Sequence, residues 1–307
     1  MDVEKPVLVV GGDGLVGYAL NEYLSRAGCR VITTTRRKAE VRPHRTLLLD
    51  LEQDPKNFEL PDKIPLAVIA AGCSGFETCR ANEELSHRIN VTNTVKLAEE
   101  LRDRGAFIVF LSSSAVFDGS AAKANEATPC SPTSVYGSQK AEAESAISAL
   151  TNNYAIVRFG KAIPHAYPRF MTWHQQLSKG LKIRVLNDLR FAPLTTDYLV
   201  ECLRLILHQE AKGIFHLSPA DDISYADVAE YICKKFGFPK GLVVAESVQE
   251  SGLKIEYVPR HAALGAAASL TRLSLAAPLA WDAVDHGLPG TRLDVQGPVE
   301  IISQGEV

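Results

Sequence analysis

The segment Val7–Gly17 constrains the fold of this 307-residue chain more than any other stretch. Its first four residues, Val7–Val10, form a continuous apolar run, which is typical of a strand buried on both faces. Glycines at positions 11, 12, 14 and 17 follow at once, and a helical pattern continues from there to about Arg26. The spacing of these glycines satisfies both G-x-x-G-x-x-G and G-x-G-x-x-G.

Glycines between a strand and a helix suit the binding of a dinucleotide. The pyrophosphate must approach backbone N–H groups at the helix N-terminus, and Cβ atoms would block it. A glycine-rich turn without a ligand is the alternative, but the position directly between strand and helix favours a binding loop. We therefore expect cofactor contacts from Gly11, Gly14, Leu15, Val16 and Gly17.

The residues after the next predicted strand, Arg30–Thr33, indicate which dinucleotide binds. A site selective for NAD usually has an acid about 20 residues beyond the glycines, where it binds the ribose 2′-hydroxyl. Here threonines lead instead into Arg36 and Arg37, and guanidinium groups suit a 2′-phosphate. The pattern predicts NADP, with NAD as the second choice, and Arg36 as a cofactor contact. Alternatively, both arginines are solvated loop residues.

Further apolar runs alternate with helical patterns through the first half of the chain. The predicted strands are Thr46–Asp50, Pro65–Gly72, Phe107–Leu111 and Tyr154–Gly160, and one long helix is expected over Glu83–Arg104. This alternation predicts an α/β fold with a doubly wound parallel sheet. Ligands bind beyond the carboxyl ends of such strands, so these ends add candidate cofactor contacts: Asp50, Ala70, Ala71 and Gly72.

The stretch from Ser112 to Lys140 contains the most reactive combination of side chains. Tyr136 and Lys140 are four residues apart in a helical pattern, so both lie on one face. A neighbouring ammonium lowers the pKa of a phenol from its reference of about 10, which suits acid/base work. Ser113, after the strand Phe107–Leu111, could hold the reacting oxygen. We expect these three residues to be catalytic.

The Tyr-x-x-x-Lys spacing carries little information alone, and the chain contains its own control. Tyr231 and Lys235 repeat the spacing in an ordinary amphipathic pattern, where packing and a solvated amine are expected. Asn90, in the predicted long helix, has two open roles. It either braces a neighbouring strand and joins a proton relay, or it is a surface amide.

Beyond Gly160 the pattern changes, because prolines interrupt shorter elements. We predict a dinucleotide-binding domain over residues 1–160, rejoined by about 190–218, and a smaller α/β substrate domain from the remainder of 161–307. A capping box is expected at Ser224–Asp227. The tail after Gly290 is rich in Gly and Pro, and we expect it to be partly disordered.

Composition limits the partners and the location. The chain has 46% hydrophobic and 22% charged residues and a net charge of −3, which indicate a globular protein without a footprint for nucleic acid or anionic membrane. No apolar run approaches the ~18 residues of a spanning helix, and the N-terminus does not resemble a signal peptide. Six cysteines without a C-x-x-C pair suggest reduced thiols, no metal site and a cytoplasmic location.

The sequence resembles an extended short-chain dehydrogenase/reductase, and within that superfamily the dTDP-4-dehydrorhamnose reductase family. The similarity is strong to about Gly160 and faint afterwards. It is carried by these segments: Gly11–Gly17, Asp50–Leu51, Ala70–Gly72, Ile89–Val91, Ser112–Gly119, Glu126–Pro132, Tyr136–Lys140 and Val157–Arg158.

The resemblance implies a Rossmann fold and hydride transfer to the ketone of a nucleotide-linked sugar. It implies that Tyr136 is the acid/base, that Ser113 polarises the carbonyl, that Lys140 also binds the nicotinamide ribose, and that Asn90 supports the relay. It adds Leu51 as a cofactor contact and suggests a homodimer. Candidate substrate contacts are Ser74, Ser114 and Arg190, with Trp173, His174, Arg184 and Arg260 as weaker ones. For Arg190 and the four weaker candidates, an ordinary surface or packing role is the alternative.

Three sister activities are weighed against this one. Sugar-nucleotide dehydratases carry an acidic pair just after the catalytic hydroxyl, and Ser114 and Ala115 stand there instead, which disfavours dehydration. An NAD(P)-dependent epimerase stays open, because such enzymes tolerate a Ser-Ser-Ser-Ala run. So does a non-catalytic role like that of the regulatory subunit of methionine adenosyltransferase.

Overall fold

A single parallel sheet organises the protein. The computed structural model describes residues 5–43 and 45–290. The sheet has seven strands in the order β3-β2-β1-β4-β5-β6-β11, and every pairing is parallel, as the sequence predicts. The strands are β1 (Val7–Val10), β2 (Val31–Thr35), β3 (Thr46–Leu48), β4 (Leu66–Ile69), β5 (Phe107–Leu111), β6 (Tyr154–Phe159) and β11 (Gly213–Leu217).

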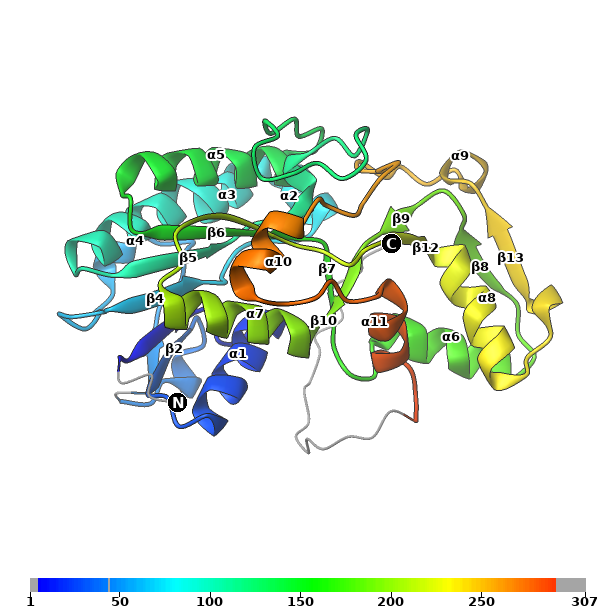
Figure 1. Cartoon of the computed structure of the whole chain (residues 1–307), viewed down its shortest axis with the longest axis horizontal. Helices are drawn as coiled ribbons and strands as arrows, with labels where there is room; N and C mark the ends of the chain where they lie inside the picture. The colour runs from blue at the N-terminus through cyan, green and yellow to red at the C-terminus, as the bar shows by residue number, and fades with distance from the viewer. Residues whose placement is uncertain (1–4, 44, 291–307) are drawn as a thin grey trace.

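Helices cover both faces of this sheet (Figure 1). Alternate residues of a strand point to opposite faces, so Val7 and Val9 pack in one apolar cluster while Leu8 and Val10 pack in another. The first cluster includes side chains of α1 (Leu15–Arg26), α7 (Thr196–Gln209) and α10 (Ala267–Leu273). The second includes side chains of α4 (Asn93–Asp103) and α5 (Val135–Leu150). The apolar runs are continuous because both faces are buried.

The strand order creates a binding edge. β1 lies between β2 and β4, so the chain moves away from β1 first in one direction and then in the other. In open α/β sheets the crevice at this reversal, beyond the carboxyl ends of the strands, is where ligands bind. The glycine loop, which follows β1, lies at this crevice.

The predicted helix over Glu83–Arg104 is confirmed as an uninterrupted helical run over 83–103, but it contains a π-helical turn that the sequence does not reveal. The structure has α3 (Glu83–His87), a π-helical turn at Arg88–Thr92 and then α4. A separate short helix, α2 (Phe76–Ala81), precedes them. Apolar periodicity does not reveal a π-turn, because the extra residue is fixed by tertiary hydrogen bonds of Asn90, described below.

The chain leaves the large sheet after β6 and builds a third apolar cluster. Its elements lie at one end of the molecule (Figure 1). Short strands pair as β7 with β10, β8 with β13 and β9 with β12. The bounds are β7 (Lys161–Ile163), β8 (Ile183–Leu186), β9 (Arg190–Phe191), β10 (Pro193–Thr195), β12 (Ile223–Ser224) and β13 (Val243–Glu246), with α6 (Pro168–Ser178), α8 (Tyr225–Phe236), α9 (Val248–Ser251) and α11 (Ala280–His286).

Two sequence expectations concern this second region. The capping box is confirmed: the Ser224 hydroxyl accepts a hydrogen bond from the Asp227 N–H, and the Asp227 carboxylate accepts one from the Ser224 N–H. α7 and β11 return to the large sheet, while a boundary at residue 160 and a substrate-binding role for the remainder stay predictions. The tail after Gly290 lies outside the described residues. Within the described ranges, no helix is both long and apolar enough to cross a membrane.

Candidate active site at the carboxyl edge of the sheet

Gly14 is the one glycine of the loop Gly11–Gly17 at which an added Cβ would make no contact shorter than 3.4 Å. A Cβ on Gly11, whose φ is +88°, would lie 2.7 Å from the backbone nitrogen of Ala71, and one on Gly17 would lie 2.1 Å from the Gly11 carbonyl oxygen. Gly14, which caps α1, meets the same oxygen at an ordinary 3.4 Å. Packing therefore explains glycine at 11 and 17, whereas the space at Gly14 fits a phosphate at the helix N-terminus. Beside it, Leu15 is 44% exposed and Val16 is half-buried.

The end of β2 holds the glycine loop in place and presents one arginine. The Gly11 N–H donates to the Thr34 hydroxyl at 3.0 Å, and the Thr35 hydroxyl donates to the Asp13 carboxylate at 2.7 Å. Arg37 forms an ion pair with Glu40 at 2.8 Å. Arg36 is exposed and directly follows β2.

The ends of β3 and β4 complete the edge. The Asp50 carboxylate accepts from the Glu52 N–H at 3.0 Å, and the Leu51 carbonyl accepts from the Asn93 side chain at 2.8 Å. Ala70 is held to β1 by a backbone hydrogen bond to Val10 at 2.9 Å. Ala71 lies against Gly11, and Gly72 is exposed. The structure thus brings the predicted cofactor residues of three strands to one edge.

Lys140 is buried in surroundings that disfavour the charged form of its side chain. Its side chain is 6% exposed, and its Nζ donates to the Leu111 carbonyl at 2.9 Å and lies 4.6 Å from the centre of the Phe110 ring. Burial lowers the pKa of this amine to about 8, although the charge of Glu144 acts in the opposite direction. Lys140 is therefore a cation that needs little energy to lose its proton near neutral pH.

Tyr136 is positioned by the start of α5. The Ser134 hydroxyl caps this helix by accepting from the Gly137 N–H at 3.1 Å. A Cβ on Gly137 would lie 2.1 Å from the Ala115 carbonyl oxygen, so α5 packs directly on the turn that follows β5. Tyr136 is buried against Cys79 and Ala115, and the Phe76 ring meets its edge at 5.3 Å.

Ser113 lies in the same turn, one residue before Ser114–Val116, and its hydroxyl accepts from the Ala115 N–H at 3.1 Å. The packing of Gly137 on Ala115 brings this turn and the start of α5 together. The three predicted catalytic residues thus share one region, at the carboxyl end of β5.

Asn90 is a brace and not a surface amide. Its side chain is 1% exposed; its oxygen accepts from the Cys73 N–H at 2.8 Å, and its nitrogen donates to the Cys73 carbonyl at 2.9 Å and to Gln139 at 2.8 Å. These contacts fix the backbone of Cys73, directly after Gly72. A Cβ added to Gly72 would lie 3.0 Å from the Asn90 side-chain oxygen and 3.7 Å from the Lys140 Nζ. Asn90 therefore positions the loop beside Lys140; a part in a proton relay stays a prediction.

A buried ion pair below Lys140 is the main feature that the sequence analysis missed. Glu144 and Arg158 are almost fully buried and 2.6 Å apart, and the Ser112 hydroxyl donates to the same carboxylate. Arg158 also contacts His216, whose pKa burial lowers to about 4, so this imidazole is neutral. The sequence contains a clue to this pair, because Glu144 is four residues after Lys140 and therefore lies on the same helix face.

The three predicted substrate contacts Ser74, Ser114 and Arg190 differ in their exposure and in their partners. Ser74 is exposed and Ser114 half-buried near the edge. Arg190 is 37% exposed and forms an ion pair with Asp222 at 2.5 Å. Because Asp222 also accepts from the Ala262 and Ala263 N–H groups, this pair ties β9 to that segment.

Three weaker substrate candidates have structural roles. Trp173 packs in the third cluster, the His174 ring meets Phe236 at 4.4 Å, and Arg184 pairs with Glu246 at 2.9 Å. These contacts agree with the packing or surface role that the sequence left as the alternative, and a part in substrate binding stays a prediction for all three. Arg260 is exposed.

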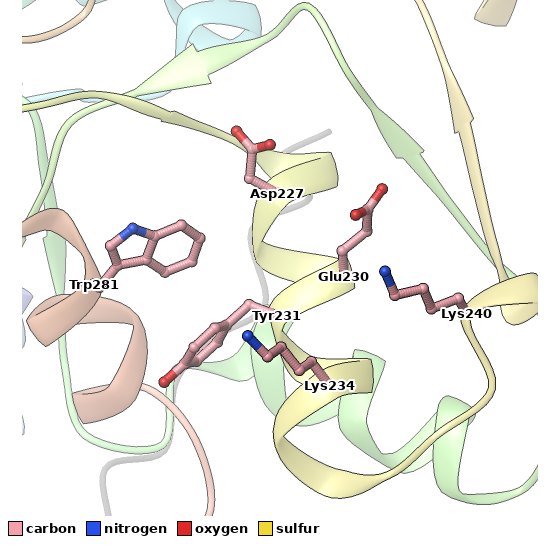
Figure 2. A pocket seen from close by; sticks show the side chains of 6 residues that line it. All are labelled: Asp227, Glu230, Tyr231, Lys234, Lys240 and Trp281. Carbon is pink, nitrogen blue, oxygen red and sulfur yellow. The ribbon is translucent and has the colours of Figure 1, made fainter.

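Two hollows lie away from the glycine loop. One of about 340 Å³ opens beside the start of α5 and is lined by residues that include Ser134, Val135 and Glu256. The other, of about 220 Å³, lies between α8 and α11 and is lined by lysines, acids, Tyr231 and Trp281 (Figure 2).

Tyr231 and Lys235 both bond to Asp285, at 2.6 and 2.5 Å. This confirms that the second Tyr-x-x-x-Lys pair is structural.

One group of potential metal ligands occurs among the described residues, in His165, Asp197 and His286, with ligand atoms within 4.8 Å. The two imidazole rings lie with their centres 3.5 Å apart and their planes tilted by 36°. None of the predicted site residues belongs to this group.

Known proteins resemble the chain over most of its length. Residues 5–283 match the family model of the RmlD substrate binding domain. The Bacillus subtilis spore coat polysaccharide biosynthesis protein SpsK is 25% identical over 81% of this chain and 85% of its own length. The beta subunit of Rattus norvegicus methionine adenosyltransferase 2 is 25% identical over 76% of this chain and 73% of its own length.

Solved structures share the fold. A Bacillus anthracis dTDP-4-dehydrorhamnose reductase in complex with NADP has a TM-score of 0.79 at 19% identity and covers 92% of this chain and 97% of its own. MoeE5, in complex with UDP-glucose and NAD, has a TM-score of 0.74 at 19% identity with the same coverage. With the family model matched over nearly the whole described chain, the protein belongs to the RmlD substrate binding domain family, the dTDP-4-dehydrorhamnose reductase-like branch of the extended short-chain dehydrogenases/reductases, which are NAD(P)-dependent oxidoreductases.

Proposed function

We propose that the protein is an NADPH-dependent reductase of a keto-sugar nucleotide, with Tyr136 as the general acid. The observation that carries this proposal is the site itself. A buried Lys140 shares a helix face with Tyr136, and Ser113 lies in the turn on which that helix packs. The family and the NADP complex of a structural neighbour support the cofactor and the substrate class.

Each residue has a distinct task in this reaction. The glycine loop receives the pyrophosphate, and Arg36 receives the 2′-phosphate; the reduced nicotinamide supplies the hydride when it is bound. Ser113 donates a hydrogen bond to the ketone oxygen, which polarises the carbonyl. Tyr136 then gives its proton to the oxygen as negative charge develops there. Lys140, protonated at neutral pH, provides a positive charge on the helix face that it shares with Tyr136, which stabilises the phenolate left by the proton transfer.

Substitution of the acid tests the assignment directly. We expect Tyr136→Phe to lower kcat by about 10²- to 10⁴-fold with folding unchanged, because a positioned general acid contributes that much. Tyr231→Phe is the matched control, since its hydroxyl bonds to Asp285 on α11 and should not affect turnover. Retention of nearly full activity by Tyr136→Phe on a confirmed substrate would refute the role of this phenol.

A regulatory subunit is the second candidate, and one observation favours it: the methionine adenosyltransferase beta subunit is as similar in sequence as SpsK. The intact Ser113, Tyr136 and Lys140 support the enzyme instead, since a binding module needs no acid/base phenol. An epimerase is the third. It keeps its oxidised cofactor through the cycle, whereas a reductase exchanges it. Purification without bound nucleotide supports the reductase; tightly retained NAD supports the epimerase, and stoichiometric co-purification with another enzyme supports the subunit.

A further inference from the structure

Two thiols lie in contact beside the proposed catalytic residues. The Cys79 sulfur is 3.5 Å from the Cys73 sulfur and 3.4 Å from the Cys73 carbonyl oxygen. Cys73 is partly exposed in the loop after β4, whereas Cys79 is fully buried in α2. The other four cysteines form no such pair among the described residues.

The two thiols differ in acidity. A hydrogen bond from Cys79 lowers the pKa of Cys73 to about 7, aided by the Gly75 N–H and the charges of Arg36 and Lys140, although burial acts against it. The same hydrogen bond and burial raise the pKa of Cys79. At pH 7 the partly exposed Cys73 thiol is therefore about half ionised, whereas the buried Cys79 keeps its proton. An accessible thiolate next to a second thiol is the arrangement of an oxidation-sensitive cysteine.

We propose that Cys73 is a site of oxidation by peroxides and that Cys79 is its resolving partner. The Cys73 thiolate attacks one oxygen of hydrogen peroxide; the O–O bond breaks, water leaves after protonation, and Cys73 becomes a sulfenic acid. The Cys79 sulfur then displaces the sulfenic oxygen as a second water. Two thiols and one peroxide thus give one disulfide and two waters, with both electrons supplied by the sulfurs. A dithiol reverses the change.

Disulfide formation would disturb the catalytic region. The sulfur–sulfur distance must fall from 3.5 Å to about 2.05 Å, so the two side chains must rotate or the Cys73 loop and α2 must shift. Both Asn90 contacts with the loop are made to the Cys73 backbone, and Cys79 packs against Tyr136. Resting on the proposed function, this predicts that oxidation lowers reductase activity and that dithiol treatment restores it.

Peptide mapping tests the chemistry without an activity assay. The intact protein is treated with hydrogen peroxide, free thiols are alkylated, and peptides are analysed by mass spectrometry without reduction. We expect a Cys73–Cys79 linkage that disappears in Cys73→Ser. In Cys79→Ser the reaction should stop at a sulfenic acid on Cys73, which dimedone traps. Cys130→Ser should keep the linkage.

Alkylation rates supply a second measurement that does not depend on the disulfide. At pH 7 a thiol with a pKa of about 7 is about half ionised, whereas an ordinary thiol is about 3% ionised. A thiolate of lower pKa is also a weaker nucleophile, which reduces its rate about fivefold. Cys73 should therefore react with iodoacetamide about threefold faster than an ordinary thiol. Cys130, which is exposed and has a raised pKa, is the internal control and should react more slowly.

Either of two results overturns the proposal: Cys73 stays alkylatable after peroxide treatment, or Cys130 reacts first. Both readouts are covalent, so they are separate from the proposed function. A linkage in a protein without reductase activity would refute only the function. An active reductase without the linkage would refute only the oxidation site.

Discussion

Lys140 is the residue whose burial links function to stability. A pKa lowered to about 8 from 10.5 corresponds to about 3 kcal/mol by which the folded state disfavours the charged amine. Below pH 8 the amine is protonated in both states, so this cost is fully present. Between pH 8 and 10.5 the unfolded state binds more protons than the folded state, so stability rises with pH through this window.

Lys140→Met should therefore abolish turnover and yet stabilise the fold at pH 7. We expect a gain of roughly 1–3 kcal/mol, reduced by the lost hydrogen bond to the Leu111 carbonyl. The gain should shrink as pH approaches 10. Urea unfolding of both proteins at pH 7 and 9.5 measures this. A variant that is less stable than the wild type at both pH values, by the same amount, contradicts the buried-charge account.

Arg36 is expected to select the cofactor. Hydrogen bonds to a charged group contribute about 1.5–3 kcal/mol, so Arg36→Ala should weaken NADPH binding about 10- to 100-fold and leave NADH binding nearly unchanged. Arg37→Ala is the control, because Arg37 pairs with Glu40. Fluorescence titration with both cofactors measures the effect. If NADH binds as tightly as NADPH to the wild type and Arg36→Ala changes neither affinity, the phosphate assignment is wrong.

At the residue scale, the sequence predicted those positions whose chemistry follows from spacing. The glycine loop and the Tyr136–Lys140 face depend on local geometry, which a sequence contains. The ion pair Glu144–Arg158 depends on a contact between α5 and β6. Trp173 depends on packing in the third cluster, and Arg184 on an ion pair with Glu246 between two short strands. Residue type alone does not distinguish such partners from substrate contacts.

Among the elements, α5 and β6 are joined by the buried pair Glu144–Arg158. Removing one partner leaves a buried charge uncompensated, which typically costs 3–5 kcal/mol. We expect Glu144→Gln to lower the free energy of unfolding by about that amount. Glu142→Gln is the matched control on the same helix, because Glu142 is exposed and pairs with His87 at the surface; its change should stay within about 0.5 kcal/mol. Equal effects of the two substitutions in urea unfolding would show that the buried pair contributes little.

Most elements of the large sheet were predictable because β1, β4 and β5 are continuous apolar runs and helices follow them in the sequence. β2 and β3 contain threonines and are joined through a short 3-10 turn. The π-turn at Arg88–Thr92 was not predictable, since it is set by Asn90 contacts with residues that are distant in sequence. The same holds for the short strand pairs of the second region. Two- to four-residue strands carry no detectable period, and their partners lie far along the chain.

For the whole molecule, the account requires that cofactor binds at the carboxyl edge of the large sheet and leaves after each turnover. The protein as purified should then contain little bound nucleotide and should bind NADPH reversibly. Calorimetric titration of NADPH into the protein measures this. One site per chain, weakened in Arg36→Ala, is the expected outcome. A nucleotide that is released only by denaturation would contradict an exchanging cofactor.

The most direct test of the proposed reductase activity is to measure NADPH oxidation in the presence of keto-sugar nucleotides. The loss of the absorbance of reduced nicotinamide reports the reaction. A panel of 4-keto sugars linked to dTDP and UDP, offered to the purified protein, includes the proposed substrate class. The account predicts steady turnover on at least one member, lowered by about 10²- to 10⁴-fold in Tyr136→Phe and unchanged in Tyr231→Phe. No turnover on any member by a folded protein that binds NADPH, or equal turnover by Tyr136→Phe, would contradict it.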